Sequence, residues 1–293
     1  MQKNSNILII NLFIWSDMCD LGSILIGVVF VALLSSSYQD LVRREVSDIH
    51  WWVIGISGVI SVAMDFQGTY GITVTIGSVL IIFDILCPLE IPRRMEYVLD
   101  TIIVCLFLIP VMISPNGEYV FETLSIIIPT IVFYVMYLMG ILKGGADAKC
   151  LITLSILFHG DVSSYAIMGT SASPLPFSLV LLFYAALLTM LYALSIMIRN
   201  VIEGNGIGFH PWYRMGLDDA RTSYVWSKQD VIDGSIAILK GVADEGVYDR
   251  LDSMGAKDVL VTPMIPFIIP ITISFAFIIL AGDPLSLLLS SLY

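Results

Sequence analysis

Residues 119–142 read YVFETLSIIIPTIVFYVMYLMGIL, and Glu122 is the one charged residue in this run. An α-helix of about 20 residues crosses the roughly 30 Å hydrocarbon core of a bilayer, so the run predicts a membrane-spanning helix. The whole chain has a matching composition, with 57% hydrophobic residues, 13% charged residues and a mean hydropathy of +0.90. Soluble domains average about 25% charged residues. A chain of 293 residues cannot bury so much apolar surface in its own core, so lipid must cover part of it.

Seven further apolar blocks flank this run. We therefore predict an all-α polytopic membrane protein with about eight transmembrane helices. The sixth block is short, so its helix is either tilted or continues through the Ala166 region. The apolar run from Ile7 to Trp15 lacks the features of a signal peptide and is expected to lie at the membrane interface. The predicted spans are Leu21 to Ser37, Trp51 to Met64, Tyr70 to Cys87, Tyr97 to Ile113, Tyr119 to Leu142, Ala148 to about His159, Phe177 to Ile198, and Met264 to Ala281.

Basic residues predict the orientation of these spans, because cytoplasmic loops collect Lys and Arg. If the first span runs from outside to inside, thirteen of the fourteen Lys and Arg lie on the inner side, and only Lys3 lies outside. We therefore expect a plasma-membrane protein with a small cytoplasmic domain before the last helix. Within it, Tyr224 to Trp226 and Ser235 to Leu239 fit either strands or short helices. The predicted organisation is a helical core over 1–199, a soluble domain over 200–262, and a final helix and tail over 263–293.

Ionisable residues at membrane depth are candidates for function, because a charge there costs at least about 2.5 kcal/mol. Four aspartates fall near the predicted cytoplasmic ends of spans, namely Asp40, Asp84, Asp100 and Asp147. Asp84 and Asp100 fit three roles: a catalytic pair, residues that flank such a pair, or interfacial partners of the arginines that lie between them. The other two aspartates have more unusual sequence surroundings.

Asp147 lies at the entry to a predicted helix, in the glycine-rich segment Lys143-Gly144-Gly145-Ala146-Asp147-Ala148-Lys149. Glycine allows another backbone to approach closely, which a site that cuts an extended peptide requires. A simpler interpretation is that Asp147 caps the N-terminus of the helix. The segment alone does not decide between these roles.

Asp40 lies in residues 38–46, YQDLVRREV, where a predicted helix exits into a basic turn. It fits an interfacial ion pair with Arg43 or Arg44 at helical spacing. However, four predicted spans separate Asp40 from Asp147, so both carboxylates return to the same membrane face and can meet. Two adjacent carboxylates share one proton, and such a pair supplies a base that activates water and an acid that protonates a peptide carbonyl.

Other hydrolytic chemistries lack their usual residues. The four cysteines form no CxxC pair, the chain has three histidines, and it contains neither HExxH nor GxSxG. We expect no metal, no cofactor and no nucleic-acid partner.

Three segments resemble the archaeal preflagellin and prepilin peptidases, membrane aspartic proteases of the GxGD class that are related more distantly to bacterial type IV prepilin peptidases and to presenilin. The segments are residues 38–46, Gly144 to Lys149 as a GADAK-like form of GxGD, and Thr262 to Pro270, which is similar to the family's TP-x-IPF-x-IP segment. The resemblance implies that Asp40 and Asp147 cut short basic leader peptides from archaellin or type IV pilin precursors at the cytoplasmic face, without N-methyltransferase activity.

The resemblance also implies supporting residues and shows two departures. Gly144, Gly145 and Ala146 would shape the backbone beside the substrate. Ala146 replaces the second glycine of strict GxGD, and the chain carries an extra pair of spans between the aspartates. Tyr38 would reach Asp40 only if the helix end unwinds. The remaining candidates for substrate binding or support are Lys149, Arg43 and Arg44.

Two other classes of function remain open. An ion-coupled transporter would also place aspartates inside a bundle and use proline-broken helices, but the chain shows no inverted repeat. In a non-catalytic membrane scaffold, Asp40 and Asp147 would be an interfacial ion-pair partner and a helix cap. His159 and Asp161 fall on the predicted outer side and are expected to be loop residues.

Overall fold

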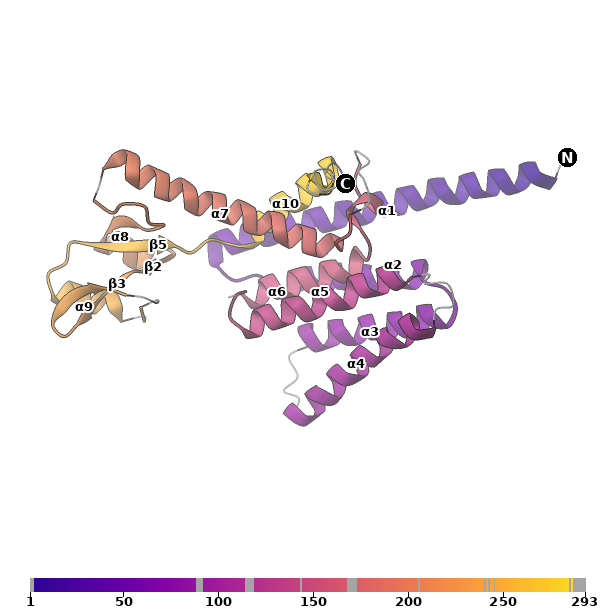
Figure 1. Cartoon of the computed structure of the whole chain (residues 1–293), viewed down its shortest axis with the longest axis horizontal. Helices are drawn as coiled ribbons and strands as arrows, with labels where there is room; N and C mark the ends of the chain where they lie inside the picture. Colours follow the sequence, from indigo (N-terminus) through magenta and orange to yellow (C-terminus); the bar gives the residue numbers. More distant parts are fainter. Residues whose placement is uncertain are drawn as a thin grey trace. The chain divides into compact units, whose positions relative to one another are not determined.

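The structure is a computed structural model that describes residues 3–87, 92–113, 119–142, 144–167, 173–204, 206–239, 241, 243–244, 246–284 and 286. Lys143 lies outside the described residues. For residues 3–21, Arg93 and Ile113 only the backbone is described, so the side chains of the predicted interfacial stretch from Ile7 to Trp15 are outside the description. The chain divides into two compact units (Figure 1). Unit 1 comprises Met1–Ala185 and Phe267–Tyr293, and unit 2 comprises Ala186–Pro266.

Each of the eight predicted apolar blocks falls on a separate helix. Among the described residues, five segments are long and apolar enough to cross a membrane: Gly22–Arg43, Gly68–Leu86, Arg94–Met112, Val120–Leu138 and Phe177–Glu203. This agrees with a polytopic membrane protein. The helices in chain order are α1 (Lys3–Arg43), α2 (Ile49–Asp65), α3 (Gly68–Leu86), α4 (Arg93–Ile113), α5 (Val120–Leu138), α6 (Gly145–Leu157), the short 3-10 helix η1 (Val162–Ser164), α7 (Phe177–Glu203) and α10 (Ile268–Ala281).

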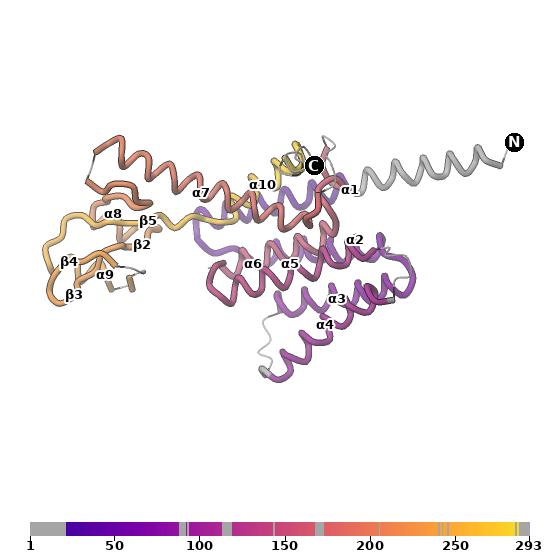
Figure 2. The backbone as a smooth tube through the Cα atoms, viewed as in Figure 1, coloured from indigo at the N-terminus to yellow at the C-terminus, as the bar shows by residue number. Residues whose placement is uncertain are grey.

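Helix α6 is the central helix of unit 1. It packs against α2, α3 and α5 (Figure 2). Every residue from Cys150 to Leu157 is buried. Its closest approach is at Gly58 of α2, where an added Cβ would lie 3.0 Å from the backbone nitrogen of Leu157. Small residues of this kind let two membrane helices touch through their backbones. The helix is apolar because protein surrounds it, and not because it faces lipid.

Of the two alternatives for the short sixth helix, the continuation toward Ala166 is wrong, and the end lies close to the predicted His159. Helix α6 ends at Leu157, after 13 residues. The chain then turns back, and the backbone N–H of Phe177 at the start of α7 donates to the carbonyl of Gly160 at 2.9 Å. Phe158 fixes this turn, because its ring stacks on Phe177 with the centroids 4.6 Å apart and also contacts Phe275 of α10 at 5.4 Å. The aromatic cluster replaces the extra turns that the apolar pattern had suggested.

The last helix begins later than predicted. Residues up to Pro263 belong to a strand, so the boundary expected at 262 falls inside an element that pairs with Val225 and Trp226. Helix α10 starts at Ile268, and Pro270 lies in its first turn. A proline is tolerated there, because the first turn of a helix has no internal hydrogen bond for its nitrogen to donate. Three prolines therefore mark a strand-to-helix transition and not a kinked helix.

Unit 2 contains the C-terminal part of α7 and a small α/β fold, so the all-α prediction is incomplete. One sheet has the antiparallel order β1-β5-β2, and the second consists of β3 and β4. Val225, Leu251 and Val261 are among the residues of its own hydrophobic core. Its elements are β1 (Tyr213–Gly216), α8 (Leu217–Thr222), β2 (Val225–Ser227), β3 (Gln229–Ile232), β4 (Ser235–Ile238), α9 (Val247–Ser253) and β5 (Asp258–Pro263).

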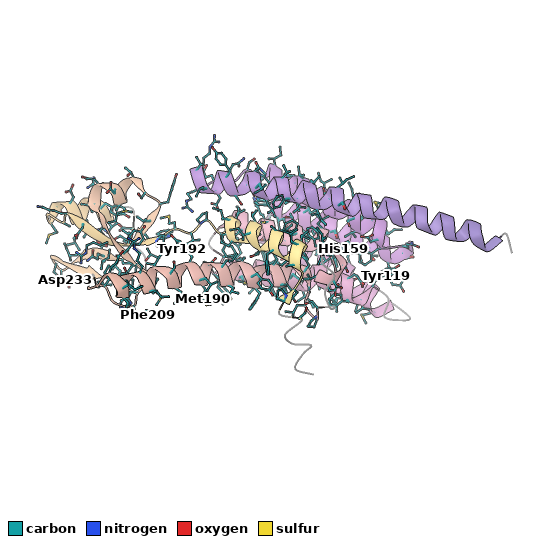
Figure 3. All side chains as sticks on the ribbon, turned by 90° about the horizontal axis from the view of Figure 1, so that it is seen from above. Tyr119, His159, Met190, Tyr192, Phe209 and Asp233 are labelled. Atoms are coloured by element: carbon teal, nitrogen blue, oxygen red, sulfur yellow. The ribbon has the colours of Figure 1, made fainter. Side chains whose placement is uncertain are left out.

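The two segments left open between strand and helix are both strands. β4 pairs with β3 through a two-residue turn at Asp233 and Gly234, which have φ angles of 49° and 73° (Figure 3). Positive φ at both central residues is the mark of a type I′ hairpin turn, for which Asp-Gly is a preferred pair. The dipeptide was therefore the signal that could have identified this hairpin from the sequence.

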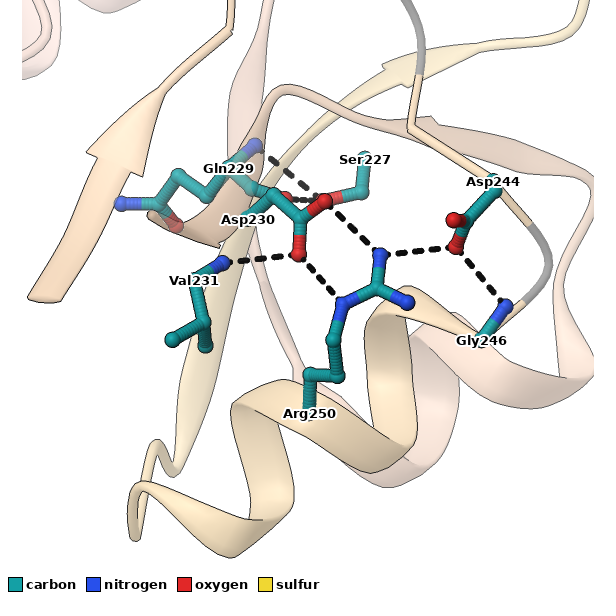
Figure 4. A network of polar contacts seen from close by, with 7 residues as sticks. All are labelled: Ser227, Gln229, Asp230, Val231, Asp244, Gly246 and Arg250. Carbon is teal, nitrogen blue, oxygen red and sulfur yellow. Dashed lines mark hydrogen bonds and ion pairs between the residues drawn. The ribbon is translucent and has the colours of Figure 1, made fainter. Parts of the chain in front are cut away.

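An ion-pair network fastens the hairpin to α9 (Figure 4). The Arg250 guanidinium donates to both carboxylate oxygens of Asp230, at 2.9 and 2.7 Å, and to Oδ1 of Asp244 at 2.7 Å. The backbone N–H of Val231 also donates to Asp230, at 2.7 Å. These hydrogen bonds, of which those from Arg250 matter most, hold the pKa of Asp230 below its usual value.

This lowered pKa predicts how the stability of unit 2 depends on pH. The folded Asp230 carboxylate binds a proton less readily than the unfolded one, so the network stabilises the fold above the usual Asp pKa of about 4. That stability is lost as the pH falls through the lower folded pKa. We expect Asp230→Asn to exchange amide hydrogens in β3 and α9 faster than wild type at pH 6, and the difference to shrink toward pH 3. Asp233→Asn is the matched control, and a difference that stays constant with pH would contradict the prediction.

Candidate active site

Asp147 lies in the first turn of α6, three residues after the N-cap Gly144. Its carboxylate accepts a hydrogen bond from the backbone N–H of Gly144, as an acidic residue at this position does in a capping box. A Cβ added to Gly144 would lie 2.5 Å from Oδ2 of Asp147, so only glycine fits there without displacing the carboxylate. The N-cap residue is Gly144 itself and Asp147 lies inside the first turn, so Asp147 is not the cap residue of the helix; the glycine is needed for close approach, since its φ is −92°.

Asp40 lies in the last turn of α1 and is half-buried. Its carboxylate accepts a hydrogen bond from the backbone N–H of Ile268, at the start of α10. Helices α1 and α10 are also joined nearby, where the hydroxyls of Ser37 and Thr272 lie 2.7 Å apart. Arg44 attracts Asp40 electrostatically and ends α1 in a left-handed conformation with φ of 56°. Residues 38–46 and the entry to the last helix therefore lie together at Asp40. These are two of the three segments that carry the family resemblance.

The structure brings Asp40 and Asp147 into one neighbourhood, where the two carboxylates interact as like charges. Each carboxylate also has a fixed backbone donor, Ile268 for Asp40 and Gly144 for Asp147. Carboxylates that repel each other in a partly desolvated site retain a proton more readily than isolated ones. The arrangement therefore places two like-charged carboxylates in one neighbourhood, as an acid–base pair that acts without a metal would require. Among the described residues, no three His, Cys, Asp or Glu side chains are grouped as metal ligands.

Lys149 points to a partner that the sequence interpretation missed. Its Nζ lies 2.8 and 2.9 Å from the two carboxylate oxygens of Asp48, next to the first turn of α2. His50 secures the same turn, because its ring nitrogens bond the Ser47 carbonyl at 2.8 Å and the Ser35 hydroxyl at 3.0 Å. Asp48 stands just before an apolar block, which is a typical helix-start signal and could have identified it. The loop after Asp40 is thus tied to both α1 and α6.

The other predicted supporting residues are more peripheral. Tyr38 is 67% exposed on a helix that stays regular through Arg43, so the unwinding that would let it reach Asp40 does not occur. Arg43 is exposed at the end of α1. Gly145 has open space, with the Tyr137 hydroxyl 3.8 Å from an added Cβ, and Ala146 packs against the core of unit 1.

Asp84 and Asp100 also come together, but away from glycine and helix starts. They interact as like charges, and Glu96 adds a third negative charge. Both aspartates line a cavity among α3, α4, α5 and α6. This pair lacks the backbone donors that accompany Asp40 and Asp147.

His159 lies in a loop as predicted, yet it is buried, with 5% of its surface exposed. Its Nε2 lies 3.1 Å from Oδ2 of Asp65 at the end of α2. The ring of Phe66 packs between His159 and Tyr119, with centroids 5.3 Å from each. These contacts close the end of α6 opposite to Asp147. A histidine followed by Gly-Asp gave no sequence signal for this role.

Comparisons with protein-family models and with curated proteins find no match to this chain.

The ion pair beside Asp147 can be tested by its coupling energy. Both side chains are partly exposed, at 28% for Lys149 and 46% for Asp48. A double-mutant cycle with Asp48→Asn and Lys149→Met should give a coupling of about 0.5–1 kcal/mol in the free energy of unfolding. The more exposed pair Arg199–Glu203, treated with Arg199→Met and Glu203→Gln, should couple more weakly. Equal coupling in the two cycles would contradict a specific role for Lys149 in holding α2 to α6.

Proposed function

We propose that this chain is a membrane aspartic endopeptidase that removes short basic leader peptides from archaellin-like or type IV pilin-like precursors at the cytoplasmic membrane face. The observation that carries the proposal is that two carboxylates more than a hundred residues apart in sequence, Asp40 and Asp147, lie near enough for their charges to interact, while the Lys149–Asp48 contact at 2.8 Å ties α6 to the loop after Asp40. The parity of the intervening spans also predicts one membrane face for both. A charged carboxylate at membrane depth has a free-energy cost, and such residues are usually functional. A hydrolytic pair is one such function.

The chemistry follows from one proton shared between two acids. The ionised carboxylate removes a proton from water, and the water oxygen attacks the carbonyl carbon of the scissile peptide bond. The protonated carboxylic acid gives its proton to the carbonyl oxygen, which forms a neutral tetrahedral intermediate. The C–N bond then breaks as the carboxylic acid gives its proton to the departing amine and the other carboxylate takes a proton from one hydroxyl of the intermediate, so the new carboxylic acid product leaves and the pair again holds one proton. No metal or nucleophilic side chain takes part.

Charge and topology support the substrate class and the sidedness of the proposed enzyme. Residues 200–261 carry ten Asp and Glu against six Lys and Arg, so their charge favours encounter with a cationic leader. A solvated acidic surface without that role has the same composition. The bias of thirteen basic residues to one side favours the cytoplasm for unit 2 and for both aspartates. About eight spans would include the short apolar helices α2 and α10 and the buried α6.

The decisive experiment is cleavage of a membrane-embedded archaellin or pilin precursor. Asp40→Asn and Asp147→Asn should each lower the cleavage rate at least about 100-fold, because each removes one member of the acid–base pair. Asp84→Asn and Asp100→Asn are matched controls that should still cut. Folding of each variant is checked by thermal unfolding in detergent. A folded Asp40→Asn or Asp147→Asn protein that still cuts would overturn the proposal and favour a transporter or a scaffold.

The two adjacent glycines provide a second, steric test. Gly144→Ala places a methyl group 2.5 Å from Oδ2 of Asp147 and must displace that carboxylate, whereas a methyl group on Gly145 would lie 3.8 Å from the Tyr137 hydroxyl. We expect Gly144→Ala to lose about 100-fold in cleavage rate, since a displaced catalytic group loses its alignment, and Gly145→Ala to stay close to wild type. Cleavage assays on the two variants, with thermal unfolding alongside, measure this. Equal activity of the two would show that the Asp147 position in the structure is not the working one.

A further inference from the structure

A cavity of about 280 Å³ lies within unit 1, among α3, α4, α5 and α6. Its walls are mostly aliphatic, and they include Ile81, Ile103, Ile127 and Ile152. A space of this size, apolar with a few polar groups, is near the lower end of the range for small-molecule sites in proteins. The Asp40–Asp147 pair does not line it, so the proposed chemistry leaves the cavity unused.

Every polar side chain in the cavity lining offers an acceptor to a ligand. Asp84 and Asp100 contribute carboxylates. The Thr130 hydroxyl donates its proton to the Ile126 carbonyl at 2.8 Å, so its oxygen is left to accept. The Tyr134 hydroxyl donates to Glu96 at 3.5 Å and is likewise left with acceptor capacity. A molecule that binds while Asp84 and Asp100 are ionised must therefore be a hydrogen-bond donor, and an acceptor or an anion is disfavoured.

The charge of the lining points the same way. Asp84, Asp100 and Glu96 repel one another, and within the described side chains no Lys, Arg or His lies within 4.0 Å of these carboxylates. Carboxylates at membrane depth usually have a cationic partner. The aliphatic walls do not suit a hydrated metal ion, which prefers a shell of oxygens. They suit a cation with an apolar body.

We propose that this cavity binds an organic ammonium group carried on an apolar stem, with Asp84 and Asp100 facing the charge and the isoleucines facing the stem. Two sources supply this chemistry. One is a free amine, and the other is a lysine side chain of a leader peptide, a source that rests on the proposed function. Binding of the ammonium group itself is independent of catalysis by Asp40 and Asp147.

Binding is measured directly by equilibrium dialysis of the full chain in detergent micelles against benzylammonium, with empty micelles as background and benzyl alcohol as the neutral counterpart. A charge-assisted hydrogen bond contributes about 1.5–3 kcal/mol, so benzyl alcohol should bind at least about tenfold more weakly. Asp84→Asn and Asp100→Asn should each weaken benzylammonium binding by about tenfold. Glu45→Gln, which removes an exposed carboxylate outside the cavity, should bind like wild type.

Equal binding of the alcohol and the ammonium, or wild-type affinity in both aspartate variants, would overturn the proposal. Competition with benzylammonium then separates the two sources. A peptide with a single lysine that competes, when its norleucine counterpart does not, identifies a substrate side chain as the ligand. Lack of competition by either peptide, with benzylammonium still bound, identifies a free amine. Because no cleavage is measured, failure here is distinguishable from failure of the peptidase proposal.

Discussion

The burial of α6 from Cys150 to Leu157 is the constraint on which unit 1 depends. Where protein surrounds a helix there is no water, so the free N–H and C=O groups of its terminal turns need partners from the chain itself. At one end, Asp147 accepts from Gly144. At the other end, the N–H of Phe158 bonds the Leu154 carbonyl, and Phe158 then packs on Phe177. The neighbouring helices gain their contacts by covering this short central element.

The same constraint explains why a carboxylate stands at that position. The helix dipole stabilises a negative charge at the start of a helix. Two residues after Asp147, Lys149 forms an ion pair with Asp48, so its positive charge is neutralised. Asp40 approaches from α1, where α10 supplies its donor. Three elements distant in sequence are thus fixed by separate interactions. The proposed acid–base pair would need preorganisation of this kind.

Residue patterns predicted the helices well and their ends poorly. Each apolar block became a helix because hydrophobicity and length are properties of the segment alone. The end of α6 depends on the contact of Phe158 with Phe177 and Phe275, which are distant in sequence, so no local pattern could place it. The strand ending at Pro263 was hidden for the same reason, since its pairing partner is Val225. Of the site, the two aspartates and Gly144 were predictable from spacing, whereas Asp48 and the Ile268 donor required the fold.

Unit 2 lies in the sequence between the two segments of unit 1, which has a consequence for biosynthesis. Asp147 leaves the ribosome more than a hundred residues before Ile268, the backbone donor of Asp40. At a synthesis rate of roughly 10 residues per second, Ile268 is made on the order of ten seconds after Asp147. During this interval the nascent chain holds the acids without the helix that completes their surroundings. The surroundings of Asp40 can therefore be complete only after unit 2 has been synthesised.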